Sequence, residues 1–148
     1  MGEKDYNAPM HSAEHILNGT MNKLFGCGRA FSSHVEKKKS KCDYHFERPL
    51  ADEELQKIQD AINGVIAQHL DITEDFISRD EAEKQFNLSR LPESAGETLR
   101  IIRIGDYDAC PCIGTHVQNT SGIGKIKIIS SDYKEGVLRI RFIREKSN

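Results

Sequence analysis

Apolar residues recur every three or four positions between Pro9 and Phe25, which is the period of an amphipathic helix. The apolar positions are Met10, Ala13, Leu17, Met21 and Leu24. Asn7 has the side chain of a helix N-cap, and Gly26 is a residue type that commonly ends helices. The pattern therefore predicts a first long helix over residues 9–25.

A second apolar stripe with helical spacing runs through residues 51–70. Its members are Leu55, Ile58, Ile62, Val65, Ile66 and Leu70. Asp52, Glu53 and Glu54 precede the stripe, where acidic side chains stabilise the positive end of the helix dipole. We expect a second long helix here, with a structural role, and a short helix over residues 80–86.

Six shorter runs have strand-like patterns. They cover residues 30–35, 42–47, 72–78, 99–104, 125–130 and 137–143. In the last run apolar and polar residues alternate, so that Arg139 and Arg141 share the face opposite Ile140. The first two and the last two runs form hairpins, the latter with a turn at residues 133–136, and residues 91–97 form a loop. The pattern predicts an α/β fold of the α+β type, with an antiparallel or mixed sheet covered by two long helices.

Length and composition narrow the class of protein. A chain of 148 residues without internal repeats predicts a single domain over residues 1–148. No run approaches the ~20 apolar residues of a membrane span, and the N-terminus has no apolar leader. We therefore expect a cytoplasmic protein with no membrane partner and with reduced cysteines. No feature of the sequence predicts an oligomeric state.

Charge is unevenly distributed along the chain, although the formal net charge is only −2. Residues 50–97 carry 4 basic and 12 acidic side chains, a net charge of −8. Residues 123–148 carry 7 basic and 3 acidic side chains, a net charge of +4. Basic ends of this kind can present one positive face to a polyanion, although ordinary solvated charges explain the pattern equally well.

Two pairs of residues have the chemistry and spacing of metal ligands. His11 and His15 are one turn apart on the first predicted helix, so both imidazoles lie on one face, at the border of its apolar stripe. Cys112 and His116 lie in a late loop, with Gly114 between them to let the backbone fold back. Neither pair alone establishes a metal site, and the Cys-x-x-x-His pair is the less specific of the two. Together, one thiolate and three imidazoles predict a zinc site between the first helix and the late loop.

These motifs resemble the editing domain of alanyl-tRNA synthetases and the stand-alone editing proteins of the AlaX type. That family pairs His-x-x-x-His on an early helix with Cys-x-Gly-Thr-His in a late loop, as found here at residues 11–15 and 112–116. Residues 117–124 also resemble the family's continuation. The related threonyl-tRNA synthetase domain typically has Pro at the position of Thr115, so Thr115 favours the alanine branch.

The resemblance implies a zinc-dependent hydrolase that removes a wrong amino acid, serine or glycine, from alanine tRNA charged elsewhere. It implies catalytic-site positions at Ser40, Gly114 and Thr115. The family usually has Gly where this chain has Ile113, whose side chain would narrow the pocket. We therefore expect Ile113→Gly to widen the set of amino acids that the site accepts.

The implied partner is the acceptor end of tRNA, and the candidate contacts are basic. They are Lys37, Lys38, Lys39 and Lys41 at the tip of the first hairpin, with Arg139, Arg141 and Arg144 near the C-terminus. A charged hairpin tip also protects a strand edge from aggregation, so its lysines alone do not establish RNA binding. His34 and His45, in the same hairpin, are expected to pack or hydrogen-bond rather than to bind metal.

Two alternatives to the editing hydrolase are a non-catalytic RNA-binding module clamped by zinc and a generic zinc hydrolase of small molecules. The generic hydrolase leaves the basic residues unexplained. The RNA-binding module is favoured by the lack of an evident general base, since Glu14 lies about 100° from His15 around the helix. Four protein ligands also fill a tetrahedral shell, which is typical of structural zinc.

Overall fold

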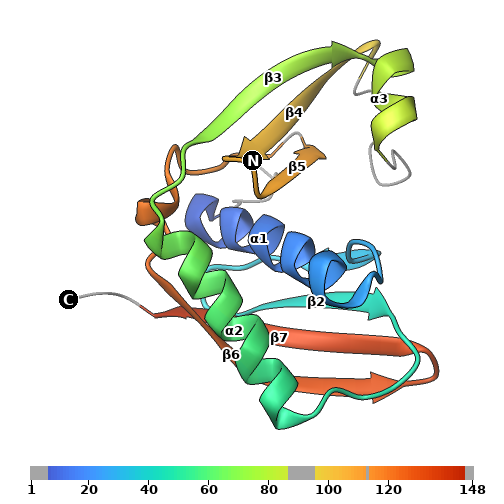
Figure 1. The fold of residues 1–148 in the computed structure, drawn as a ribbon, viewed down its shortest axis with the longest axis vertical. Coiled ribbons are helices and arrows are strands. Elements are labelled where there is room, and N and C mark those ends of the chain that lie inside the picture. Colours follow the sequence, from blue (N-terminus) through green and yellow to red (C-terminus); the bar gives the residue numbers. More distant parts are fainter. Residues whose placement is uncertain (1–6, 87–95, 113, 146–148) are drawn as a thin grey trace.

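The computed structural model describes residues 7–86, 96–112 and 114–145. Two antiparallel sheets lie on opposite sides of helix α1 (Ala8–Phe25), as Figure 1 shows. The larger sheet has the strand order β1-β2-β7-β6, and the smaller has the order β3-β4-β5. The predicted α+β fold is confirmed, but the strands form two sheets instead of one.

The four-stranded sheet joins the two ends of the chain. It contains β1 (Ser32–His34), β2 (Ser40–His45), β7 (Val137–Glu145) and β6 (Lys125–Lys134). Strands β2 and β7 pair along their length, so Cys42 lies opposite Ile140 and Tyr44 opposite Leu138. All four of these side chains are fully buried. The early and late predicted hairpins therefore share one core.

Helix α1 is buried on both sides, which sets it apart from an ordinary amphipathic helix. Every residue from Met10 to Met21 is buried, polar residues included. Both predicted ends are confirmed, because Asn7 Oδ1 accepts a 2.9 Å hydrogen bond from the Met10 N–H and Gly26 adopts φ 65°. The prediction that His11 and His15 lie at the border of the apolar stripe needs correction, since the smaller sheet covers them.

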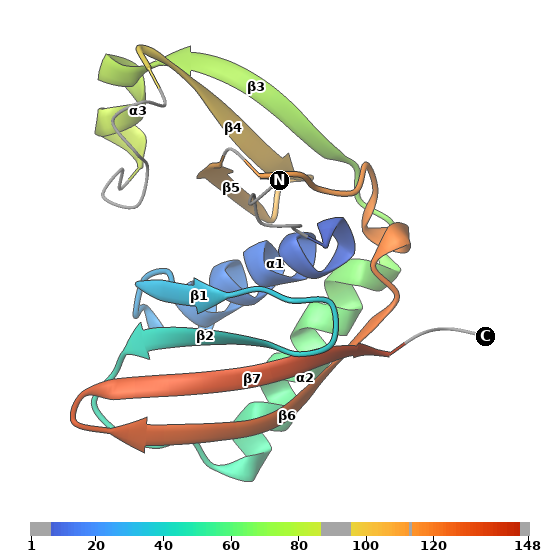
Figure 2. The same cartoon turned by 180° about the vertical axis from the view of Figure 1, so that it is seen from behind.

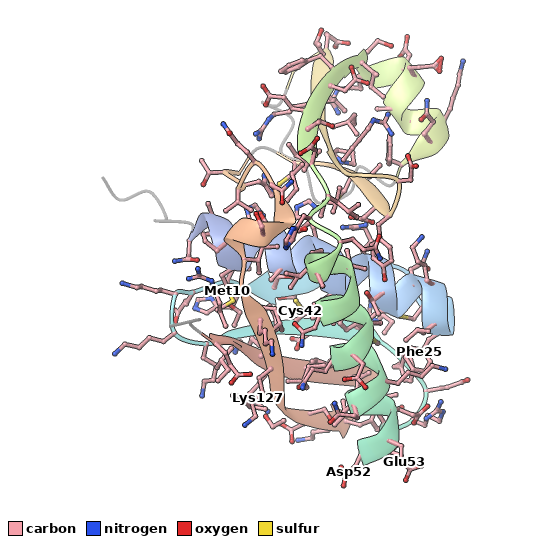
Figure 3. All side chains as sticks on the ribbon, turned by 60° about the vertical axis from the view of Figure 1, so that its left-hand side comes forward. Met10, Phe25, Cys42, Asp52, Glu53 and Lys127 are labelled. Atoms are coloured by element: carbon pink, nitrogen blue, oxygen red, sulfur yellow. The ribbon has the colours of Figure 1, made fainter. Side chains whose placement is uncertain are left out.

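Helix α2 (Asp52–Ala67) packs beside α1 and along the edge strand β6. The Asn63 side chain donates to the Ile126 carbonyl and accepts from the Ile126 N–H, both at 2.9 Å. The helix thus occupies backbone groups that an edge strand otherwise exposes. The acidic start of α2, with Asp52 and Glu53, lies at the end of the helix that is farther from the smaller sheet (Figure 3). Met10 of α1 and Cys42 of β2 are both fully buried.

The smaller sheet contains β3 (Ile72–Ser78), β4 (Thr98–Ile104) and β5 (Asp108–Pro111), with the short helix α3 (Arg79–Gln85) after β3. Of these three strands, β5 lies nearest to α1 (Figure 2). The sequence pattern does not predict strand β5, which is absent from the six strand-like runs. The strand is only four residues long, includes a proline and is half-buried throughout, so neither length nor alternation reveals it.

Several predicted boundaries shift by a few residues. Strand β6 continues to Lys134, and the turn that follows is confined to Glu135 and Gly136 instead of residues 133–136. Most of the predicted loop over residues 91–97 lies outside the described residues. In the part of the chain that the structure describes, no helix is long and apolar enough to cross a membrane.

Asn18 is the polar centre of the core around α1. Its Oδ1 accepts a 2.7 Å hydrogen bond from the Tyr44 hydroxyl and a 3.0 Å bond from the Ala30 N–H. Burial raises the pKa of Tyr44 well above its usual value, so the hydroxyl keeps its proton and remains a donor. One side chain thus connects α1, β2 and the segment before β1.

Removing this acceptor should cost more than removing one of its donors. We expect Asn18→Ala to lower the free energy of unfolding by about 2–4 kcal/mol, because two buried donors lose their partner. The matched change Tyr44→Phe removes the hydroxyl donor itself, so no buried donor is left without a partner. It should lower the free energy of unfolding by about 1 kcal/mol. Urea unfolding of both variants measures the difference, and equal losses would contradict this role of Asn18.

Candidate metal centre

Four potential metal ligands converge between α1 and the segment that follows β5. His11 and His15 come from α1, and Cys112 and His116 come from the late segment. Each offers one ligand atom, and all four atoms lie within 4.8 Å of one another. The imidazole centroids of His11 and His116 are 4.4 Å apart, and those of His15 and His116 are 4.6 Å apart. The structure therefore brings the two predicted pairs together.

The polar atoms of this cluster fit a metal ion. His15 Nδ1 and both ring nitrogens of His116 are buried and have no hydrogen-bond partner among the described residues. Buried polar atoms without a partner are costly, and each one in a native structure requires an explanation. A metal ion bound through nitrogen would supply the missing interaction for His116. The cluster therefore has the donors, spacing and unmet bonding capacity of a metal site.

The sulfur of Cys112 is in the form that binds metals. Burial raises its pKa, but the neighbouring imidazoles of His11, His116 and His15 outweigh burial and lower the pKa to about 3. The thiol is therefore ionised at neutral pH. His15 is the matching cation: burial lowers its pKa, but Asp108 and Cys112 hold the pKa at about 9. A metal ion that binds here must displace the His15 proton.

His11 is oriented by the late segment itself. Its Nδ1 lies 3.1 Å from the Thr115 carbonyl oxygen, and its Nε2 lies 3.6 Å from Cys112 Sγ. Since a carbonyl only accepts, Nδ1 carries the proton and Nε2 remains as the ligand atom, an arrangement common around metal-binding histidines. Thr115 thus contributes through its backbone, while its side chain is exposed.

Gly114 is required by close packing. A Cβ atom at this position would lie 2.3 Å from His11 Cε1, a distance that no side chain can adopt. The Arg100 guanidinium donates a 2.7 Å hydrogen bond to the Gly114 carbonyl and a 2.6 Å bond to Glu74. On the other side, the Val117 N–H donates to Ser12 Oγ at 3.1 Å. The late segment is therefore tied to both β4 and α1.

Glu14 needs the largest correction. Its angular distance from His15 made it a poor candidate for a general base, yet its carboxylate lies 3.5 Å from Nε2 of His11, three residues earlier. The Glu14 side chain is only 8% exposed. The spacing His-x-x-Glu-His at residues 11–15 signals this arrangement, because the motif occurs in zinc hydrolases whose glutamate acts beside the metal. A carboxylate is thus present at the cluster.

The other predicted catalytic positions are placed differently. Ser40 is buried, and its hydroxyl accepts from the Glu36 N–H at 2.9 Å and donates to the Glu36 carbonyl at 3.1 Å. The hydroxyl therefore closes the connection between β1 and β2. Ile113 lies outside the described residues. His34 binds Glu36 and His45 stacks on Phe31 with ring centroids 4.0 Å apart, so neither belongs to the metal cluster.

The basic residues divide into two groups. Lys37, Lys38 and Lys39 are exposed and Lys41 is half-buried, and no ion pair of these lysines is found among the described residues. The arginines are engaged within the protein. Arg139 pairs with Asp43 at 2.7 Å, Arg141 pairs with Asp132 at 2.6 Å, and Arg144 donates to the Ile123 carbonyl at 2.5 Å. The connection with the lysines lies toward the end of α1 that carries His11 (Figures 1 and 2).

Comparisons with known proteins agree with this site. The family described as the threonyl and alanyl tRNA synthetase second additional domain matches residues 99–141, which include Cys112 and His116. The chain is 38% identical over 138 residues to an alanine–tRNA ligase of Staphylothermus marinus, and 34% identical over 135 residues to one of Fervidobacterium nodosum. A Bdellovibrio bacteriovorus alanine–tRNA ligase is 32% identical over 143 residues.

These alignments cover 90%, 90% and 95% of this chain, but only 15%, 16% and 16% of the respective ligases. The similarity thus extends over both pairs of candidate ligands and over both sheets, while it concerns one segment of much longer proteins. The chain is therefore similar over most of its length to one segment of alanine–tRNA ligases, and its residues 99–141 match the family described as the threonyl and alanyl tRNA synthetase second additional domain.

Proposed function

We propose that the chain is a zinc-dependent hydrolase that removes serine, and secondarily glycine, from mischarged alanine tRNA in trans. The observation that carries the proposal is the buried cluster of one thiolate and three imidazoles, with the Glu14 carboxylate beside it. The homology to alanine–tRNA ligases supports the choice of tRNA as the substrate. Thr115 supports the alanine branch over the threonine branch.

Zinc is the metal that this set of ligands suits best. A set of four ligands made of one thiolate and three imidazoles is typical of Zn²⁺, whereas Mg²⁺ and Ca²⁺ prefer oxygen ligands. When bound, zinc can polarise the ester carbonyl or lower the pKa of a water molecule to about 7. His11, His15, Cys112 and His116 would hold the ion, with His11 binding through Nε2.

Glu14 supplies the base that the reaction needs. Ester hydrolysis forms a bond from a water oxygen to the carbonyl carbon and breaks the bond from that carbon to the ribose oxygen. We assign Glu14 Oε1 to accept the proton of the attacking water and to return it to the departing ribose oxygen. Ser40 keeps the pocket wall in shape by closing the β1–β2 connection, and Gly114 and Thr115 fix His11.

The exposed lysines are proposed to contact the acceptor end of tRNA. Lys37, Lys38 and Lys39 are the strongest candidates because no partner among the described residues neutralises them. Arg139, Arg141 and Arg144 contribute positive potential, with their hydrogen bonds already committed within the protein. The alternative, a non-catalytic RNA-binding module with structural zinc, is favoured by the four protein ligands, which fill a tetrahedral shell.

The metal content of the purified protein tests the ligand assignment. We expect one tightly bound zinc ion per chain, and we expect the Cys112→Ala, His116→Ala double variant to lose it because only two ligands remain. Cys110→Ala serves as the control, since Cys110 precedes the ligand but is not one of the four. Full zinc occupancy in the double variant would refute the assignment.

Release of serine from Ser-tRNA(Ala) separates the hydrolase from the RNA-binding module. We expect zinc-loaded protein to clear Ser-tRNA(Ala) and to spare Ala-tRNA(Ala). Glu14→Gln should lower kcat by about 10²–10⁴, the usual contribution of a general base, while zinc content remains unchanged. Glu83→Gln, on the exposed face of α3, is the control for a lost carboxylate. Intact Ser-tRNA(Ala) after treatment with wild-type protein would favour the module.

The salt dependence of tRNA binding tests the lysines. Replacing Lys37, Lys38, Lys39 and Lys41 by alanine should weaken binding and flatten its salt dependence by about 0.7–0.9 units of slope per lost phosphate contact. Alanine at the exposed residues Lys57, Lys84, Lys125 and Lys127 changes net charge by the same amount and should leave the slope nearly unchanged. Equal slopes for the two variants would contradict a specific role of the hairpin.

A further inference from the structure

A buried carboxylate, that of Asp108, lies close to His15. Asp108 stands at the start of β5, and its side chain is only 7% exposed. Arg29 donates two hydrogen bonds to this carboxylate, from Nη1 to Oδ1 at 2.8 Å and from Nη2 to Oδ2 at 3.1 Å. Such two-pronged pairing fixes the plane of the carboxylate as well as its position.

The helix surface beneath Asp108 is shaped to admit it. Gly19 lies one helical turn after His15 on the same face of α1. A Cβ atom at Gly19 would lie 3.0 Å from Asp108 Oδ1 and 3.2 Å from its carboxyl carbon, closer than side chains normally pack. Glycine in the middle of a helix is unfavourable by about 1 kcal/mol relative to alanine, so its presence here favours the close approach of Asp108.

The carboxylate lies near Nδ1 of His15. Asp108 Oδ2 lies 3.8 Å from His15 Nδ1. A movement of less than about 1 Å would bring the two atoms to hydrogen-bonding distance. His15 Nδ1 is buried and makes no hydrogen bond within the described residues. The corresponding nitrogen of His11 does have an acceptor within hydrogen-bonding distance, because its Nδ1 lies 3.1 Å from the Thr115 carbonyl oxygen.

We propose that Asp108 is a positioning residue for the metal centre: its carboxylate accepts a hydrogen bond from the Nδ1–H of His15 and thereby presents Nε2 of that ring to the metal. Arg29 holds the carboxylate in place, and Gly19 provides the space for it. The inference rests on the zinc site proposed above. Partners of this kind fix the tautomer and the orientation of a metal-binding histidine, and their loss typically lowers metal affinity 10- to 100-fold.

Zinc affinity, measured by competition with a chromophoric chelator, tests the proposal without any assay of activity. We expect Gly19→Ala and Asp108→Ala each to weaken zinc binding 10- to 100-fold. Gly64→Ala is the matched control, because Gly64 lies within α2 and a Cβ atom there meets nothing within 4 Å. Asp106→Ala is the control for a lost carboxylate, since Asp106 is exposed in the turn before β5.

A double-mutant cycle distinguishes positioning from a general effect on the fold. If Asp108 acts through His15, Asp108→Ala should change zinc affinity less than twofold in a His15→Ala background. The same loss in both backgrounds would assign Asp108 to the fold and overturn the proposal, as would wild-type affinity in Gly19→Ala. If Asp108→Ala does not fold, Gly19→Ala decides the question. Absence of zinc binding by the wild-type protein would overturn the metal centre itself, together with this proposal.

Discussion

The double-sided burial of α1 is the constraint on which the rest of the structure depends. A helix between two sheets has no solvent-facing side on which to leave polar groups, yet six of the buried residues between positions 11 and 20 of α1 have polar or ionisable side chains. Asn18 is satisfied by Tyr44 and Ala30, and Thr20 by Tyr107 at 2.6 Å. The histidines depend instead on the late segment. Among the described residues, the one polar side-chain atom of α1 that is buried without a hydrogen-bond partner, His15 Nδ1, lies at the candidate metal centre.

The smaller sheet positions the other two candidate ligands, Cys112 and His116. Strand β5 pairs with β4 and ends one residue before Cys112, so the ligand follows a hydrogen-bonded strand instead of a free loop. Arg100 then holds the Gly114 carbonyl, and the absence of a side chain on Gly114 lets the backbone reach the His11 ring. The same short strand carries Asp108 at its start. One four-residue strand therefore places both a ligand and the proposed partner of another ligand.

The cluster of four candidate ligands could be predicted from the sequence because short spacings on known kinds of element determine their geometry. The spacing of His11 and His15 on a helix is local information, and the cap residues Asn7 and Gly26 are equally local. Asp108, Arg29 and Arg100 could not be predicted, because each acts on a residue far away in the chain. The place of Glu14 beside His11 was missed for a different reason: only its angle to His15 was considered, whereas its contact is with His11. Strand β5 is too short for any periodicity to reveal it.

X-ray absorption at the zinc edge of the purified protein tests the central claim most directly, because it counts ligand atoms by element and distance. The account predicts one sulfur at about 2.3 Å and a shell of imidazole nitrogens at about 2.0–2.1 Å. The spectrum should lose its sulfur contribution in Cys112→Ser and keep it in Cys110→Ser. A shell without sulfur, or one with two sulfurs that includes Cys110, would contradict the assignment of the metal to His11, His15, Cys112 and His116.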